Sequence, residues 1–356
     1  MNHQVLSSPQ RNRHPSRALY LLTHRKGELM TDRQIRGQRD EGDLPRYAGI
    51  ATFALLPRLD EVERADIAVV GIPFDSGTSF RPGARFGPAH IREHSRQLHP
   101  YHAVHDSFPF ANNQIADAGD FGVGPYDIEA AVASIHAQAQ RLTSQGTRIL
   151  ALGGDHTVAL PLLRAAAEVH GPLAVLHFDA HLDTWDVLHG ASIWHGSPFR
   201  RAAEEGLLDL EHCQHVGIRG GIYDPSELED DRRAGFRIIR TEEFQERSVQ
   251  DIADQVLQRL GTGPVYISVD IDVLDPAHAP ATGTPEVGGL STREFFAVLR
   301  KLNGLDIVGG DVVEVAPAYD HAGVTGLAAA HTAWELLTLM GLPVGNPSTN
   351  TSEGAR

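Results

Sequence analysis

Short apolar runs rich in β-branched residues alternate with amphipathic segments through most of this 356-residue chain. Each run is long enough for a buried strand and far too short to cross a membrane. The runs lie at residues 67–73, 148–154, 173–179, 214–219, 236–240, 265–272 and 307–315. Helical patterns lie at residues 89–98, 127–143, 249–260, 291–303 and 325–341, and after Thr157. This alternation predicts an α/β fold whose mainly parallel sheet is covered on both faces.

The ends of the chain lack this alternation. Residues 1–44 are polar and rich in arginine, and we predict a disordered tail there. The acid-poor stretch 1–29 also suits an organelle transit peptide, or a start codon placed too early, with Met30 as the true first residue. We expect one domain over residues 45–342 and a flexible C-terminal tail over 343–356.

Charge and cysteine content exclude several classes of protein. Lys and Arg number 31 against 46 Asp and Glu, a formal charge of −15, which argues against a protein that neutralises nucleic-acid phosphates. No apolar run reaches membrane-spanning length, so we expect no membrane partner. Cys213 is the single cysteine and cannot form an intramolecular disulfide, which suits the reducing cytoplasm.

Polar clusters follow four of the predicted strands. Because ligands in such folds collect beyond the carboxyl ends of the strands, we expect these clusters to meet. They are GGDH at 153–156, DAHLD at 179–183, DIDVLDP at 270–276 and EVAPAYD at 314–320. Unpaired carboxylates next to a core cost much free energy. A cation is therefore expected between them.

Within these clusters the acidic and histidine residues have the spacing of metal ligands. Asp179, His181 and Asp183 would share one side of an extended chain, and two further aspartates repeat the spacing. The predicted metal-ligand set is His156, Asp179, His181, Asp183, Asp270 and Asp272. Four carboxylates balance two divalent cations, which predicts a two-metal site that generates hydroxide at neutral pH. Taken alone, GGDH could instead be a tight turn in which Asp155 caps a helix.

These segments, with HGSPFRRA at 195–202, resemble the ureohydrolase family of arginases and agmatinases. RYAGIATF at 46–53 and the segment 71–93 resemble the agmatinase branch. The resemblance covers residues 45–342 and implies a three-layer α/β fold, a binuclear manganese centre, with nickel in a few relatives, and a trimeric or hexameric homo-oligomer. The Gly-rich stretch 81–88 lacks the phosphate-loop pattern and is interpreted as a rigid loop that shapes the cleft or contacts another subunit.

The resemblance also assigns roles residue by residue. One ion would be bound by His156, Asp179, Asp183 and Asp270, and the other by Asp179, His181, Asp270 and Asp272. It further implies that His195 is the proton shuttle and Glu314 the carboxylate that receives the substrate guanidinium. A planar guanidinium suits a carboxylate, and the departing amine needs a proton. Asp183 would orient the hydroxide that attacks the guanidinium carbon, and the products would be an amine and urea or a substituted urea.

The sequence constrains the part of the substrate beyond the guanidinium group less strongly. Trp185, His189 and Trp194 are candidates to line an outer pocket, although subunit or loop packing explains them equally well. We expect an agmatinase-like enzyme, with 4-guanidinobutyrate, another guanidinoalkanoate, an alkylguanidine or a biguanide as alternative substrates. LDTWD at 182–186 differs from the arginase pattern and makes true arginase the weaker choice. A catalytically silent scaffold subunit and a two-metal phosphoesterase are the alternatives from other classes.

Overall fold

The structure is a computed structural model that describes residues 35–39 and 44–345. The chain divides into two units, Met1–Arg33 and Gln34–Arg356, and the second carries every element described below. The predicted tails at 1–44 and 343–356, with the transit-peptide and Met30 alternatives, fall outside the described residues except for 35–39, 44 and 343–345.

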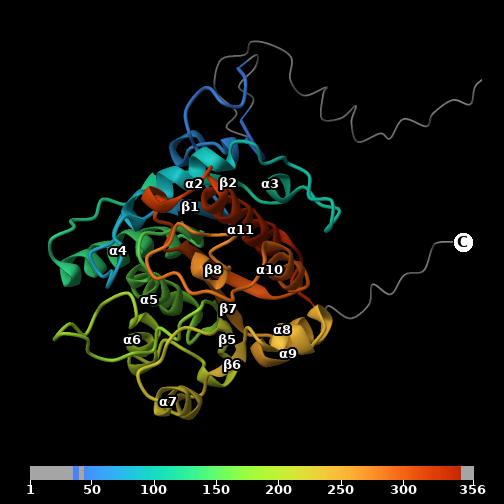
Figure 1. Cartoon of the computed structure of the whole chain (residues 1–356). Coiled ribbons are helices and arrows are strands. Elements are labelled where there is room, and N and C mark those ends of the chain that lie inside the picture. Colours follow the sequence, from blue (N-terminus) through green and yellow to red (C-terminus); the bar gives the residue numbers. More distant parts are fainter. Residues whose placement is uncertain (1–34, 40–43, 346–356) are drawn as a thin grey trace, which may run out of the picture. The chain divides into compact units, whose positions relative to one another are not determined.

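Eight parallel strands form one sheet in the second unit, in the order β2-β1-β3-β8-β7-β4-β5-β6 (Figure 1). The strands are β1 (Ile67–Gly71), β2 (Ile115–Asp120), β3 (Arg148–Leu152), β4 (Ala174–Phe178), β5 (Gln214–Ile218), β6 (Arg237–Arg240), β7 (Pro264–Asp270) and β8 (Asp306–Val313). The predicted α/β fold is confirmed, and the sheet is parallel throughout. Seven strands fall within or beside the predicted apolar runs.

Strand β2 was not predicted. Its sequence IADAGD contains one β-branched residue, and its last three residues are partly or fully exposed. It lies at one edge of the sheet; among the described strands its partner is β1, from Ile67↔Ile115 to Gly71↔Asp120, and Asp117 also forms an isolated bridge with Arg58. Edge position, rather than intrinsic β propensity, explains why so polar a segment is a strand.

Helices cover both faces of the sheet, giving three layers (Figure 1). They are α2 (Gly87–Ser95), α3 (Pro109–Asn112), α4 (Ile128–Thr143), α5 (Ala159–His170), α6 (Pro198–Glu204), α7 (Ser226–Ala234), α8 (Glu243–Glu246), α9 (Val249–Leu260), α10 (Thr292–Leu299) and α11 (Val324–Gly341). Capping boxes fix the starts of α9, through Ser248 and Asp251, and of α10, through Ser291 and Glu294. Among the described residues, no helix combines the length and apolar character that a bilayer crossing requires.

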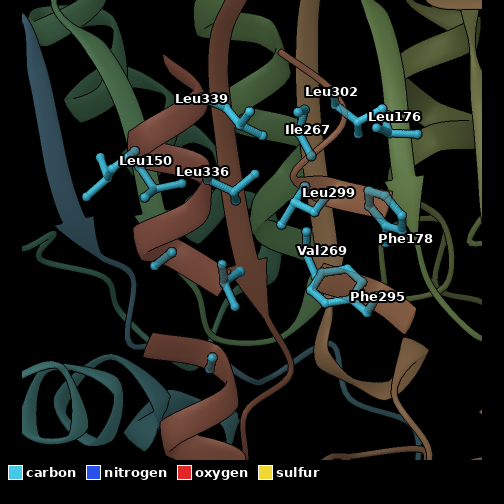
Figure 2. Close-up of a cluster of buried hydrophobic side chains, with 14 of the residues drawn as sticks. Leu150, Leu176, Phe178, Ile267, Val269, Phe295, Leu299, Leu302, Leu336 and Leu339 are labelled. Atoms are coloured by element: carbon cyan, nitrogen blue, oxygen red, sulfur yellow. The ribbon is translucent and has the colours of Figure 1, made fainter. Parts of the chain in front are cut away.

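Alternate residues of each strand enter the two halves of the core. On one face, Ile267 and Val269 of β7 meet Phe295 and Leu299 of α10 and residues of α11 (Figure 2). On the opposite face, Tyr266 of β7 joins the cluster that includes residues of α4, α5 and α6. Burial on both faces explains why most positions of the central strands are apolar.

The four central strands bring their carboxyl ends side by side. In the register, Leu152 of β3 pairs with Val312 of β8, Val313 of β8 pairs with Asp270 of β7, and Val269 of β7 pairs with Phe178 of β4. The four polar clusters predicted from the sequence follow these four strands. One edge of the sheet therefore receives all of them.

Candidate metal centre

His156 enters the centre through a tight turn after β3. A Cβ on Gly154 would lie 1.6 Å from the carbonyl oxygen of Phe74, so only glycine fits there. Asp155 then caps the short helix His156–Val158 by accepting the Thr157 N–H, and its other oxygen accepts the Gly77 N–H. The capping role considered for this motif therefore belongs to Asp155, while the fully buried His156 faces the aspartates.

Asp179, His181 and Asp183 lie in the loop that follows β4. The strand ends at Phe178, so the prediction that an extended chain aligns these three side chains is wrong. The loop curls: the Asp179 carboxylate accepts the backbone N–H of His181 at 2.6 Å, and Asp183 has a left-handed φ of 54°. Such a conformation is costly for a residue with a Cβ and occurs where the surroundings impose it.

The second aspartate pair sits at the end of β7. Asp270 is the last strand residue, and its Oδ1 accepts the N–H of Asp272, which lies in the short helix Ile271–Val273. Asp272 in turn accepts the N–H of Ala180 from the neighbouring loop. Backbone donors therefore hold both carboxylates, which are nearly completely buried.

All six predicted ligands converge in two adjoining halves. In the first, Nδ1 of His156 lies 2.8 Å from Asp183 Oδ2, 3.3 Å from Asp179 Oδ2 and 3.5 Å from Asp270 Oδ2. In the second, Nδ1 of His181 lies 3.3 Å from Asp179 Oδ1 and 3.2 Å from Asp272 Oδ2. Asp179 thus directs one carboxylate oxygen to each histidine and belongs to both halves.

A layer of buried polar residues that the sequence did not single out supports this centre. Nε2 of His177 lies 2.8 Å from Asp179 Oδ2, and Nδ1 of His177 lies 2.7 Å from Nδ1 of His215. Nε2 of His156 lies 2.8 Å from Ser268 Oγ, which donates to Asp311. The sequence signal that could have revealed this layer was the presence of polar residues within buried strands, where apolar residues are normal.

Crowding of the carboxylates perturbs their protonation. Burial, with the charges of Asp272 and Asp179, raises the pKa of Asp270 well above its usual value. Burial and Asp179 likewise raise the pKa of Asp272 to about 6. The pKa values of His156 and His181 are raised well above normal because, although burial opposes their charge, the surrounding aspartates outweigh it. The centre therefore favours bound positive charge.

These properties fit a pair of divalent ions. Nδ1 of His156 is buried without a hydrogen-bond partner of normal geometry, yet three carboxylate oxygens surround it. Nitrogen and carboxylate donors in this ratio suit hard or borderline divalent metals. Bound ions would replace the protons that the histidines otherwise carry.

His195 and Glu314 lie together beside the first half of the centre. Nδ1 of His195 is 2.9 Å from Oε1 of Glu314, which also accepts the backbone N–H of His156 at 2.9 Å. Burial opposes charge on His195, but Glu314, Asp183 and Asp155 outweigh it and raise the pKa of His195 to about 9. Glu314, like Asp183, has a left-handed φ, of 64°. Its second oxygen, Oε2, is buried and has no hydrogen-bond partner among the described residues.

Two neighbours of this pair were missed by sequence reasoning. Oγ of Ser79 lies 2.7 Å from Nε2 of His195, and the Ser79 N–H also points at this nitrogen at 3.1 Å. A Cβ on Gly283 would lie 3.0 Å from Oε2 of Glu314. Ser79 therefore fixes the imidazole ring, and Gly283 leaves room beside the unpartnered oxygen.

The outer residues are only partly brought together. Trp185 and Trp194 stack with ring centroids 5.8 Å apart and an interplanar angle of 9°, and Gly196 permits this because a Cβ there would lie 2.4 Å from Trp194. The Trp185 ring is 6.2 Å from that of His181, next to the centre. His189 is exposed in the tight turn Leu188–Ala191, with φ 50°.

A three-layer fold on a parallel sheet, with a buried histidine–aspartate cluster that could hold metal at the carboxyl ends of its strands, is the arrangement of a class, the α/β metal-dependent hydrolases. A sequence model described as the arginase family matches residues 65–338. The chain therefore belongs to the arginase family, as the resemblance in its motifs predicted, and it is a hydrolase of the ureohydrolase type.

Named relatives and solved structures agree with this assignment. The chain is 40% identical to a guanidinobutyrase of Pseudomonas aeruginosa over 87% of this chain and 98% of that protein. It is 44% identical to the mitochondrial agmatinase of Gallus gallus over 83% and 87% of the two chains. The crystal structure of proclavaminate amidino hydrolase from Streptomyces clavuligerus superimposes with a TM-score of 0.80 at 43% identity, covering 84% of this chain and 99% of that one.

Proposed function

We propose that the chain hydrolyses the guanidinium group of a small amine, with agmatine as the first candidate substrate, and releases urea. The observation that carries this proposal is Oε2 of Glu314, a buried carboxylate oxygen without a partner beside the histidine–aspartate centre. A guanidinium offers N–H donors in the plane that such an oxygen accepts. Binding there would hold the guanidinium carbon next to the metal centre.

The proposed division of roles follows from the distances. His156, Asp179, Asp183 and Asp270 would hold one ion and Asp179, His181, Asp270 and Asp272 the other. Two divalent ions, when bound, would lower the pKa of water and so supply hydroxide as the nucleophile at neutral pH. We propose manganese as the resident metal and nickel as the second choice.

Side chains of the protein would orient the reactants and transfer the proton. Glu314 would orient the guanidinium, and Asp183 would orient the attacking water-derived group through a hydrogen bond. His195, whose ring contacts Glu314 and Ser79, would deliver a proton to the departing amine. Its raised pKa keeps that proton available at neutral pH.

Charge at the rim supports a substrate with a distal ammonium. Oε2 of Glu227 accepts the indole N–H of Trp185, and Oε1 of Glu286 lies 3.8 Å from Nε2 of His181, so acidic groups lie beside the second half of the centre. Arg219, which could have bound a distal carboxylate, instead donates to backbone carbonyls, among them those of Asp272 and Glu286. These contacts favour agmatine.

One observation favours 4-guanidinobutyrate as the alternative. The Arg81 guanidinium lies over the Tyr319 ring at 5.1 Å, and the Arg81 backbone N–H donates to Gly283, the residue beside Glu314. A distal carboxylate could pair with it. We further propose a homo-oligomeric, cytoplasmic enzyme, trimeric or hexameric, without nucleic-acid or membrane partners; light scattering would test the assembly.

Urea release from the manganese-loaded protein tests the function. The assay should compare wild type with Glu286→Gln and Arg81→Gln, and Arg141→Gln, at an exposed position, is the control. The substrates to test are agmatine, 4-guanidinobutyrate, 3-guanidinopropionate, arginine, guanidine and alkylated biguanides. For agmatine as substrate we expect Glu286→Gln to raise KM and Arg81→Gln to have little effect; the reverse pattern identifies a guanidino acid. A fully metallated protein that releases no urea from any of them would support the silent-scaffold alternative.

A further inference from the structure

A second group of side chains that could hold a metal ion lies at the junction of α2 and α11 and shares no residue with the strand-end centre. His90 and His94 are four residues apart on α2, so they share one face of that helix. Their rings are 4.5 Å apart and inclined at 73°. Asp320, just before α11, places Oδ2 2.7 Å from Nε2 of His90. One ligand atom from each of the three side chains lies within 4.8 Å of the other two.

Backbone N–H groups of α11 hold the carboxylate of this group in place. Asp320 accepts the backbone N–H groups of Thr325 and Gly326 in the first turn of α11, and its side chain is only 3% exposed. Because these donors fix the rotamer, little conformational entropy remains to be lost when a ligand binds. Oδ2 of Asp320, which accepts the Gly326 N–H, is also the oxygen that contacts His90.

Two glycines let the imidazoles approach α11. A Cβ on Gly323 would lie 2.2 Å from Cε1 of His94, and a Cβ on Gly326 would lie 2.3 Å from Cδ2 of His94 and 2.6 Å from Nε2 of His90. Any larger residue at either position would push the rings away from Asp320. The close approach therefore depends on small residues at both points of contact.

The donor set determines the kind of ion. Two imidazole nitrogens and one carboxylate oxygen suit zinc and its first-row neighbours better than magnesium or calcium. Histidines at i and i+4 on one helix face are a common way to hold such an ion. His90 and His94 are both partly exposed, which gives an ion access and leaves a position for water.

We propose that His90, His94 and Asp320 form a third metal site, separate from the binuclear centre, that binds zinc and joins α2 to the start of α11. The ion would take the place of the proton that His90 Nε2 now shares with Asp320. One of the joined segments packs against the residue that follows Glu314: a Cβ on Gly87, at the start of α2, would lie 2.7 Å from the Val315 carbonyl oxygen. Zinc here would stabilise the substrate side of the active site without touching substrate.

Metal analysis tests the proposal. The protein is first loaded with manganese and then incubated with zinc. After unbound metal has been removed, the manganese and zinc bound per chain are measured. We expect one more zinc per chain in wild type than in His94→Ala or His90→Gln, and wild-type content in His170→Gln, an exposed histidine of α5. Zinc should also raise the Tm of wild type by a few degrees, and of the two site variants by less.

Two outcomes would overturn it. Equal zinc content in wild type and both site variants excludes the site. In a second protein carrying Asp179→Asn and Asp272→Asn, zinc should persist; its loss there would place the zinc in the strand-end centre instead. Because neither measurement uses urea release, an inactive enzyme would count against the proposed function and leave this result intact.

Discussion

The imidazole of His195 and the carboxylate of Glu314 share one short contact, 2.9 Å from Nδ1 to Oε1, and this contact leaves Oε2 of Glu314 as the unpaired oxygen. One side chain therefore does two things: it holds the proposed proton donor and presents a free acceptor to a guanidinium.

The stability of the metal-free protein should depend on His195 between about pH 6.5 and 9. The folded state raises the pKa of His195 to about 9, so the stabilisation from its charge is fully present below the unfolded value of about 6.5 and is lost as the pH rises through 9. The shift corresponds to roughly 3 kcal/mol. The Tm of wild type minus that of His195→Asn should shrink over this window. A constant difference from pH 6 to 10 would contradict the prediction.

Glu314→Gln should keep the shape of the site and lose the charge that we propose binds the guanidinium. Since charge-assisted hydrogen bonds contribute about 1.5–3 kcal/mol, kcat/KM should fall roughly 10- to 150-fold, with manganese content unchanged. Steady-state urea assays and metal analysis on the same preparation measure both. Normal kcat/KM in this variant would remove Glu314 from substrate binding.

Gly283→Ala should block the space beside Glu314. The added Cβ would lie 3.0 Å from Oε2, where a guanidinium N–H is expected to bind, so KM should rise several-fold while metal content stays the same. Gly263→Ala is the matched control, because a Cβ there has no heavy atom within 4 Å. Identical kinetics in the two variants would show that Gly283 does not border the substrate.

Asp270→Asn should abolish most activity through loss of metal. This carboxylate faces His156 and lies next to Asp272, so both halves of the centre should lose affinity, and urea release should fall by about 100-fold or more. Chelator treatment of wild type should reproduce the loss, and added manganese should restore wild type alone. Near wild-type turnover in Asp270→Asn would refute the ligand assignment.

His177→Asn should weaken metal binding although His177 is not among the proposed ligands. Burial lowers the pKa of His177 to about 3, so the ring is neutral at pH 7 and can donate its Nε2–H to Asp179. Loss of such a supporting hydrogen bond typically costs 10- to 100-fold in metal affinity. Competition with a chelator measures the manganese Kd. An unchanged Kd, with folding verified by circular dichroism, would limit His177 to packing.

Much of this molecule could be predicted from its sequence because strand burial leaves a strong pattern. Both faces of β1 and β4 are covered, so β1 is apolar throughout and β4 is apolar except at His177, and the polar residues that follow β4 stand out against that background. Parallel strands end at the same edge, so the polar clusters could be placed together before any coordinates existed. The edge strand β2 carries no such pattern and was missed.

Other features depend on tertiary contacts that no local pattern records. Ser79 reaches His195 across 116 residues, and the ring of His215 reaches His177 across 38. Asp183 joins its partners through a left-handed turn rather than by strand alternation. For Trp185, His189 and Trp194 the structure adds a stacked indole pair and an exposed loop, and their contact with substrate stays a prediction.

The position of Asp179 between His156 and His181 has a consequence for how the enzyme acquires its ions. A single carboxylate cannot be aligned for one ion without also being aligned for the other, so filling either half prepares its neighbour. Metal uptake should then be cooperative, with sigmoidal titrations and few half-loaded molecules. At low metal concentration, the enzyme would then consist of fully loaded, active chains and metal-free, inactive chains, instead of chains that all have reduced activity.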